Sequence, residues 1–222
     1  MPVIILNGRV WGRLQKKPFF FAAATITLIG WAWSRMVTSH TWWSFGQTFM
    51  LGIDVIHHLP VEEALFYPFG GILCLFLYIL LCSSKKFQNR KRPTVYWGFL
   101  VAGALVFVGL AWATWHHKPA YLISQLVVYD LMCCLFLAPI VAGDMDLLAL
   151  SVPVILVGSS GFGWDYFAIK HGWWVYHAVT RMSLLNVPIE EFNYYLFAPA
   201  SAISIYLAFC QFFKVPQTIS TH

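Results

Sequence analysis

Trp164-Asp-Tyr-Phe-Ala-Ile-Lys-His-Gly-Trp-Trp-Val-Tyr176 repeats an earlier block of the same chain, Trp33-Ser-Arg-Met-Val-Thr-Ser-His-Thr-Trp-Trp-Ser-Phe45, without a gap. A second motif follows each block, Pro188-Ile-Glu-Glu191 in the later copy and Pro60-Val-Glu-Glu63 in the earlier one. The loop between block and motif has 11 residues in the later copy and 14 in the earlier one. The chain has only nine acidic residues. A duplication that keeps adjacent carboxylates in such a chain indicates a paired site.

The composition indicates a membrane protein. The chain is 59% hydrophobic and 10% charged, with a mean hydropathy of +0.68, whereas soluble domains are about 25% charged. A helix needs roughly 20 apolar residues to cross the hydrocarbon core, and six segments approach or reach that length. Too little polar surface remains to cover such a bundle in water. The expected spans are Pro18–Trp33, Ala64–Cys82, Thr94–Trp115, Tyr121–Gly143, Leu147–Trp164 and Phe192–Phe213.

The repeat and the spans together predict an all-α, polytopic transmembrane helix bundle of about six helices built from two parallel repeats. Residues 1–93 form the first, shortened repeat, residues 94–120 contain a joining helix, and residues 121–222 form the second repeat. Two crossings separate the copies, so the second returns in the same orientation as the first. Both glutamate pairs are therefore expected at one end of the bundle, around an axis along the membrane normal.

The charges predict the orientation. Ten of the fourteen Lys and Arg residues fall at the termini or in the loops 83–93 and 143–146, which share one side of the membrane. The positive-inside rule places both termini in the cytoplasm, and the basic charge then needs no nucleic-acid partner. The five cysteines lie in apolar stretches without a CxxC pair, which favours neither zinc nor disulfides. We find no metal-ligand or dinucleotide motif and expect no metal or cofactor.

The repeated acids begin their helices. Proline suits the first helical turn, so taking Pro60 and Pro188 as first helical residues makes the glutamates third and fourth. Adjacent helical residues point about 100° apart, so one glutamate of each pair is expected to face inward. Helix capping would explain a single copy, but the duplication argues for a site. A further acid, Asp165, stands where the first copy has Ser34. The candidate catalytic residues are Glu62, Glu63, Asp165, Glu190 and Glu191.

Aromatic residues surround both acid pairs. Tryptophan and tyrosine belts are common at membrane interfaces, but aromatic faces near acids also suit chemistry that forms a carbocation. Asp130 is the one acid deep within a span, either functional or hydrogen-bonded to another helix. The candidate substrate-binding residues are Trp33, Trp42, Trp43, Tyr67, Trp164, Trp173, Trp174, Tyr176, Asn193, Tyr194 and Tyr195.

These motifs resemble one known family. Trp164-Asp165, the aromatic segment Gly172–Tyr176 and Pro188-Ile-Glu-Glu191 are similar to the integral-membrane lycopene cyclase domain, in its fused, tandem-repeat form. The family repeat has three helices, with Trp-Asp ending the second and Pro-x-Glu-Glu starting the third. Here the resemblance covers roughly 18–82 and 121–213. The first repeat departs from the family, because it lacks an opening helix and has Ser34 in place of aspartate.

The resemblance implies lycopene or carotenoid end-group cyclisation without net redox change. An acid protonates a terminal isoprenyl double bond, a neighbouring double bond closes a ring on the cation, and a base removes a proton. The substrate would be an apolar isoprenoid drawn from the lipid membrane, and homo- or hetero-oligomerisation stays open. The alternatives are a terpene cyclase acting on another prenyl chain, such as a prenylated aromatic or indole, a proton-coupled transporter and a purely structural membrane subunit.

Overall fold

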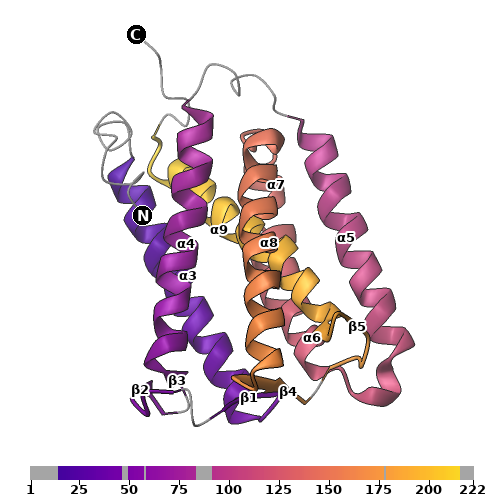
Figure 1. Ribbon diagram of the computed structural model, residues 1–222. Coiled ribbons are helices and arrows are strands. Elements are labelled where there is room, and N and C mark those ends of the chain that lie inside the picture. The colour runs from indigo at the N-terminus through magenta and orange to yellow at the C-terminus, as the bar shows by residue number, and fades with distance from the viewer. Residues whose placement is uncertain (1–14, 47–49, 58, 84–91, 178, 216–222) are drawn as a thin grey trace.

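The computed structural model describes residues 15–46, 50–57, 59–83, 92–177 and 179–215 (Figure 1). Within these ranges six helices are long and apolar enough to cross a membrane, which confirms the predicted all-α, multi-pass bundle. Five of them are single helices. The fourth is a composite helix of three segments, with a central π-helical stretch that the sequence did not predict. The spans are α3 (Lys16–Ser39), α4 (Val61–Cys82), α5 (Pro93–Ala113), the composite helix α6 (Ala120–Gln125), η3 (Leu126–Leu135) and α7 (Ala138–Val141), α8 (Leu147–Lys170) and α9 (Ile189–Phe212).

Helices α3 and α8 are equivalent members of the two repeats. Each has 24 residues and ends at a histidine cap, His40 or His171. A left-handed residue follows each cap, Thr41 (φ 54°) or Gly172 (φ 68°), a conformation that commonly terminates helices. Ending these helices at Trp33 and Trp164 was wrong, since both continue about one and a half turns further. Long basic side chains near a helix end reach water while their stems stay in apolar surroundings, so such charges do not stop the helix.

Two short strands join the repeats at one end of the bundle, at the bottom of Figure 1. Strand β1 (Trp43–Phe45) pairs antiparallel with β4 (Trp174–Tyr176), and Ser44 lies opposite Val175. These two residues are themselves equivalent in the repeat, so the register centres on a two-fold axis. The amide of Gly46 donates to Trp173, and its counterpart His177 donates to Trp42. The two copies therefore face each other symmetrically, as parallel repeats require.

The acid-bearing helices α4 and α9 begin just after two small hairpins. Strand β2 (Asp54–Ile56) pairs with β3 (Leu59–Pro60), and β5 (Ser183–Leu184) pairs with β6 (Val187–Pro188). The prolines are cap residues with extended backbone (ψ 150° and 143°), not the first helical residues. Their place in the hairpins holds ψ extended. The glutamates consequently occupy the second and third helical positions, one earlier than predicted.

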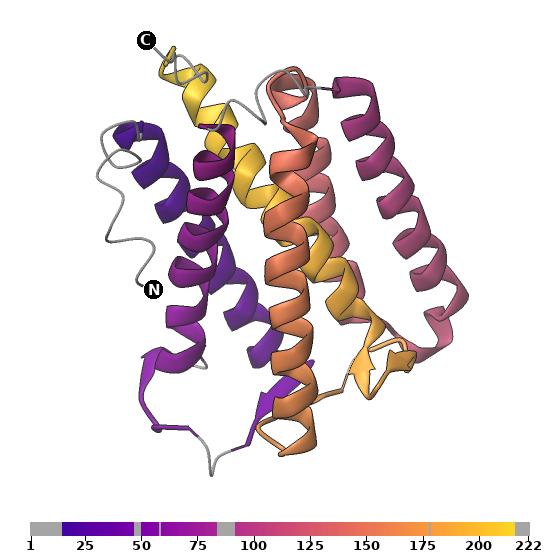
Figure 2. The ribbon, with the colours of Figure 1, turned by 45° about the horizontal axis from the view of Figure 1, so that its top comes forward.

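Helix α9 is the most buried of the six spans and packs against α3, α4, α8 and the composite helix. Helix α5 lies at the edge of the bundle beside the composite helix (Figure 2). Asp130 of η3 is buried and accepts a hydrogen bond from Asn193 of α9 (3.3 Å). The intramembrane acid therefore holds two helices together.

Each repeat packs a tyrosine ring against a glycine. A Cβ atom at Gly30 of α3 would collide with the Tyr67 ring of α4, and one at Gly161 of α8 would collide with the Tyr195 ring of α9. Glycine and tyrosine are equivalent in both pairs. Small residues let membrane helices approach closely, and here the approach brings each tyrosine hydroxyl to the acids.

Alanine at Gly161 is expected to destabilise the bundle by about 1–3 kcal/mol, the usual cost of overpacking a close contact. Gly163 of the same helix has open space around it, so alanine there is a matched control and should be neutral or stabilising by up to about 1 kcal/mol. Unfolding in mixed micelles by a denaturing detergent measures both. Equal effects at the two positions would contradict the close contact.

Candidate active site

An open groove of about 1010 Å³ runs along α4 and α8. Its lining is mostly apolar, and carboxyl groups from both repeats reach it: Glu62 and Glu63 of α4, Asp165 of α8 and Glu191 of α9. Helices α4 and α9 both begin at the strand-bearing end of the bundle (Figure 1). The acids therefore lie at this end of the groove.

In the first repeat Glu63 is the inward acid. Its Oε1 atom accepts hydrogen bonds from the Tyr67 hydroxyl (2.8 Å) and from the Ser34 hydroxyl (3.2 Å). All three side chains are buried. Glu63 therefore acts as a hydrogen-bond acceptor toward two hydroxyl groups.

In the second repeat Glu191 is the inward acid, and it has an acidic neighbour. Asp165 stands where the first repeat has Ser34, and its carboxyl group lies beside that of Glu191. Two carboxyl groups side by side in an apolar site cannot both be ionised without strong repulsion, so they hold a proton between them. The Tyr195 hydroxyl donates to Asp165, and the Tyr121 hydroxyl donates to Glu191 (2.7 Å). The second repeat therefore holds a pair of carboxyl groups with a proton to donate where the first has the single carboxyl group of Glu63.

Tyr176 of β4 supplies another hydroxyl to Glu191. Burial of this hydroxyl, followed by the nearby charges of Glu191 and Asp165, raises the pKa of Tyr176 well above its ordinary value. Tyr176 thus keeps its proton and acts as a hydrogen-bond donor. Asp165 is also close enough to Glu63 for their charges to interact. The acids of the two repeats therefore lie around the same part of the groove.

The other glutamate of each pair fastens a loop. Oε1 of Glu62 accepts from the backbone N–H of Leu51 (2.7 Å), and Oε1 of Glu190 accepts from that of Thr180. These are equivalent interactions in the two repeats. Glu190 is fully buried and does not line the groove. The adjacent glutamates thus divide into an inner pair, Glu63 and Glu191, and an outer pair that fixes the preceding loops, of which Glu62 also lines the groove.

The groove brings together most of the residues that the sequence singled out. Three of them lie elsewhere: Glu190 binds its loop, Trp42 packs against His40, and Asn193 bonds to Gln125 and Asp130 inside the bundle. Asn193 was misplaced because its helix face meets the composite helix. The predicted residues that line the groove are Glu62, Glu63, Asp165, Glu191, Trp33, Trp43, Tyr67, Trp164, Trp173, Trp174, Tyr176, Tyr194 and Tyr195.

Stacked aromatic rings form the inner wall. Trp33 lies parallel to Tyr194, with ring centroids 5.8 Å apart, and its indole N–H donates to Ser124 (3.0 Å). The equivalent tryptophans Trp43 and Trp174 adjoin each other, and within the described part of the chain their indole N–H groups have no hydrogen-bond partner. The wall therefore offers π faces to a cation, and two buried indole N–H groups beside it have no hydrogen-bond partner among the described residues.

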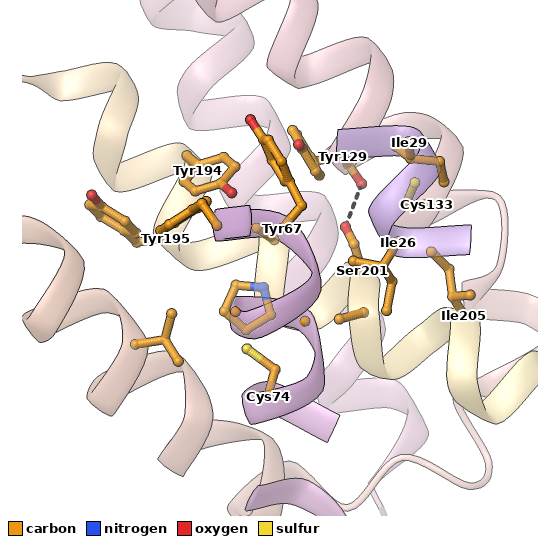
Figure 3. A pocket seen from close by; sticks show the side chains of 17 residues that line it. Ile26, Ile29, Tyr67, Cys74, Tyr129, Cys133, Tyr194, Tyr195, Ser201 and Ile205 are labelled. Atoms are coloured by element: carbon orange, nitrogen blue, oxygen red, sulfur yellow. Dashed lines mark hydrogen bonds between the residues drawn. The ribbon is translucent and has the colours of Figure 1, made fainter. Parts of the chain in front are cut away.

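A smaller cavity of about 50 Å³ lies deeper in the bundle (Figure 3). Tyr67, Tyr194 and Tyr195 line both the cavity and the groove. In Figure 3 these tyrosines stand together, with Cys74 further along the cavity wall. The tyrosine cluster consequently separates the acids from an apolar interior.

The sequence did not predict two hydrogen bonds to the acids, nor the α4 side of the groove. Ser34 appeared only as a departure from aspartate, yet it donates to Glu63. Tyr121 belongs to no repeated motif, so nothing in the sequence connected it with Glu191. The α4 side of the groove, with Leu65, Phe69 and Leu73, looks like any lipid-facing helix in the sequence.

Comparison with known proteins finds no matching family model, no matching curated protein and no matching solved structure. The function is therefore inferred from the chemistry of the groove and from the motif resemblance.

Proposed function

We propose that this chain is a membrane isoprenoid cyclase that closes an end group of lycopene or a related carotenoid. One observation carries the proposal: Glu63, Asp165 and Glu191 converge on an aromatic, mostly apolar groove. A protonation-initiated cyclisation needs an acid, a base and a site that excludes water. The two repeats supply the acid and the base separately.

The Asp165–Glu191 pair acts as the acid. Its shared proton is transferred to the terminal double bond of the substrate, which leaves a tertiary carbocation. The π electrons of a neighbouring double bond attack this cation and close a six-membered ring, moving the positive charge into the ring. Glu63 then removes a proton next to the cationic carbon, and the C–H electrons become the new double bond. One proton enters and one leaves, so the reaction is an isomerisation.

The pairing of the acids supports this division. Asp165 and Glu191 lie side by side and hold a proton between them, whereas the hydrogen-bond partners of Glu63 are two hydroxyl groups. The rings of Trp33, Trp164 and Trp174 stand around the space where the cation forms. Their electron-rich faces stabilise positive charge.

The charge distribution of the sequence supports an orientation with both termini in the cytoplasm. The acids then lie toward the opposite face of the membrane, at the end of the bundle that carries the strands. An apolar substrate reaches this level from within the bilayer. Acids gathered at helix starts on one side favour a reaction site over a transport path through the middle of the membrane.

Expression in a lycopene-accumulating bacterial host is expected to yield cyclised carotenoid. Chromatography with mass spectrometry detects it, because cyclisation changes retention and absorption but leaves the mass unchanged. The control is the same host with an empty vector. Lycopene that remains unchanged, with the protein confirmed in the membrane fraction, would contradict the carotenoid assignment.

A second candidate is a cyclase for a prenylated aromatic compound. The buried indole N–H groups of Trp43 and Trp174, which have no hydrogen-bond partner in the described part of the chain, favour it, because a phenolic oxygen that reached either group would satisfy it. Incubating membranes that contain the chain with a prenylated phenol tests this candidate. A product of unchanged mass and fewer double bonds supports it, and recovery of intact prenylated phenol counts against it.

A further inference from the structure

The two-fold symmetry of the repeats is broken on one side of the groove. In the second repeat the composite helix covers α9, and Asn193, Phe197 and Ser201 are buried there. Cys134 and Tyr129 of η3 contact Ser201 directly. This side of α9 is thus closed by protein.

The equivalent side of α4 is open within the described part of the chain. Leu65, Phe69 and Leu73 occupy the positions of Asn193, Phe197 and Ser201, and they are 48%, 56% and 41% exposed. All three line the groove. The groove therefore occupies the place that an opening helix of the first repeat would take.

The tryptophans that begin the repeated blocks show the same asymmetry. Trp33 is 4% exposed because Tyr121, Ser124 and Tyr129 of the composite helix surround it. Its equivalent Trp164 is 49% exposed and lines the groove. Among the described residues, α4 and α8 thus lack the neighbour that their counterparts α9 and α3 have.

The side chains of the open wall suit an apolar chain better than a helix. Close packing of membrane helices favours small or hydrogen-bonding residues, and α9 presents Asn193 and Ser201 to the composite helix. The same positions of α4 carry bulky Leu65 and Leu73. Neither offers a hydrogen bond, and both would hold a helix away.

We propose that this open position is a lateral passage for a linear polyisoprene. One end group slides from the bilayer to Glu63 and the Asp165–Glu191 pair, while the rest of the chain lies against Leu65, Phe69 and Leu73 and reaches lipid. This deepens, and rests on, the proposed cyclase function. The composite helix closes the equivalent position beside α9, so each binding event presents a single end group to the acids.

Photolabelling tests the passage without requiring turnover. The full chain in lipid nanodiscs is irradiated with a geranylgeranyl probe that carries a diazirine near its middle, and mass spectrometry maps the adducts. We expect adducts on both sides of the groove, at Phe69 and Leu73 of α4 and at Leu156 of α8. Excess unlabelled linear polyisoprene should compete with them. Adducts spread evenly over all lipid-facing helices, without competition, would overturn the passage.

Narrowing the passage gives a second test. Leu73→Trp is expected to reduce both competed labelling and product formation about tenfold or more, because small misfits in an apolar pocket change rates by this much. Leu105→Trp is the matched control, since Leu105 is 65% exposed on α5, outside the groove. Equal losses in the two variants would overturn the proposal.

Failure of the proposed passage can be distinguished from failure of the proposed cyclase function. Competed labelling of the α4 wall without any cyclised product supports the passage and contradicts the cyclase function. Product formation that Leu73→Trp leaves unchanged contradicts the passage and leaves the cyclase function standing.

Discussion

Glutamine at position 191 is expected to reduce cyclisation by about 10²–10⁴-fold, the usual contribution of a positioned acid or base. In the proposed reaction, Glu191 and Asp165 hold between them the proton that starts the cyclisation. An amide cannot donate it with comparable ease. Glu63→Gln should cause a loss of the same order, because it removes the base in the other repeat. Initial rates of product formation in membranes, normalised to the amount of folded protein, measure both.

Glu190→Gln is the matched control, since Glu190 precedes Glu191 on the same helix and faces away from the groove. The amide oxygen of glutamine can still accept the hydrogen bond from the Thr180 N–H. Activity should therefore stay within a few-fold of the unsubstituted chain. A loss in Glu190→Gln as large as that in Glu191→Gln would show that the inner and outer roles are assigned wrongly.

Alanine in place of Trp33 is expected to destabilise the protein by about 3–5 kcal/mol, the usual cost of removing a buried tryptophan. The change leaves a cavity between α3, α9 and the composite helix, and it removes the hydrogen bond to Ser124. The equivalent substitution Trp164→Ala should cost only about 1 kcal/mol, because that ring is half exposed and contributes mainly ring contacts.

Both tryptophan variants can be compared by detergent-induced unfolding of the purified protein. The pair is a stringent comparison, because the same residue type occupies the same repeat position in both cases. Equal destabilisation would mean that the composite helix does not pack against Trp33 as described.

The repeat predicted more of the site than any single motif could. Glu63 and Glu191 were expected near each other because their motifs match and two crossings separate them. The β1–β4 register and the inward acids agree with that geometry. The pairing of Asp165 with Glu191 was not predictable, because it depends on how α8 and α9 are rotated against each other. The glycine–tyrosine contacts determine that rotation.

The helix ends were predicted less well. The sequence placed the ends of α3 and α8 at their tryptophans, yet both continue to the left-handed residues that follow His40 and His171. Hydropathy locates the stretch that lies in hydrocarbon and is insensitive to helical turns that continue into the interface. The π-helical segment η3 also escaped detection, because its apolar composition resembles that of an α-helical span.

The sequence by itself determined the six spans, the two copies and the identity of the acids, because these depend on composition and local pattern. Only the tertiary structure decided which carboxyl groups meet and which side of the site is open. The same motif in two copies gives a buried Trp33 and an exposed Trp164, and it gives a lone Glu63 and a paired Glu191. The difference arises from the composite helix, which covers one copy and has no counterpart over the other among the described residues. The sequence could not show this, because contacts between distant segments leave no periodic signal in it.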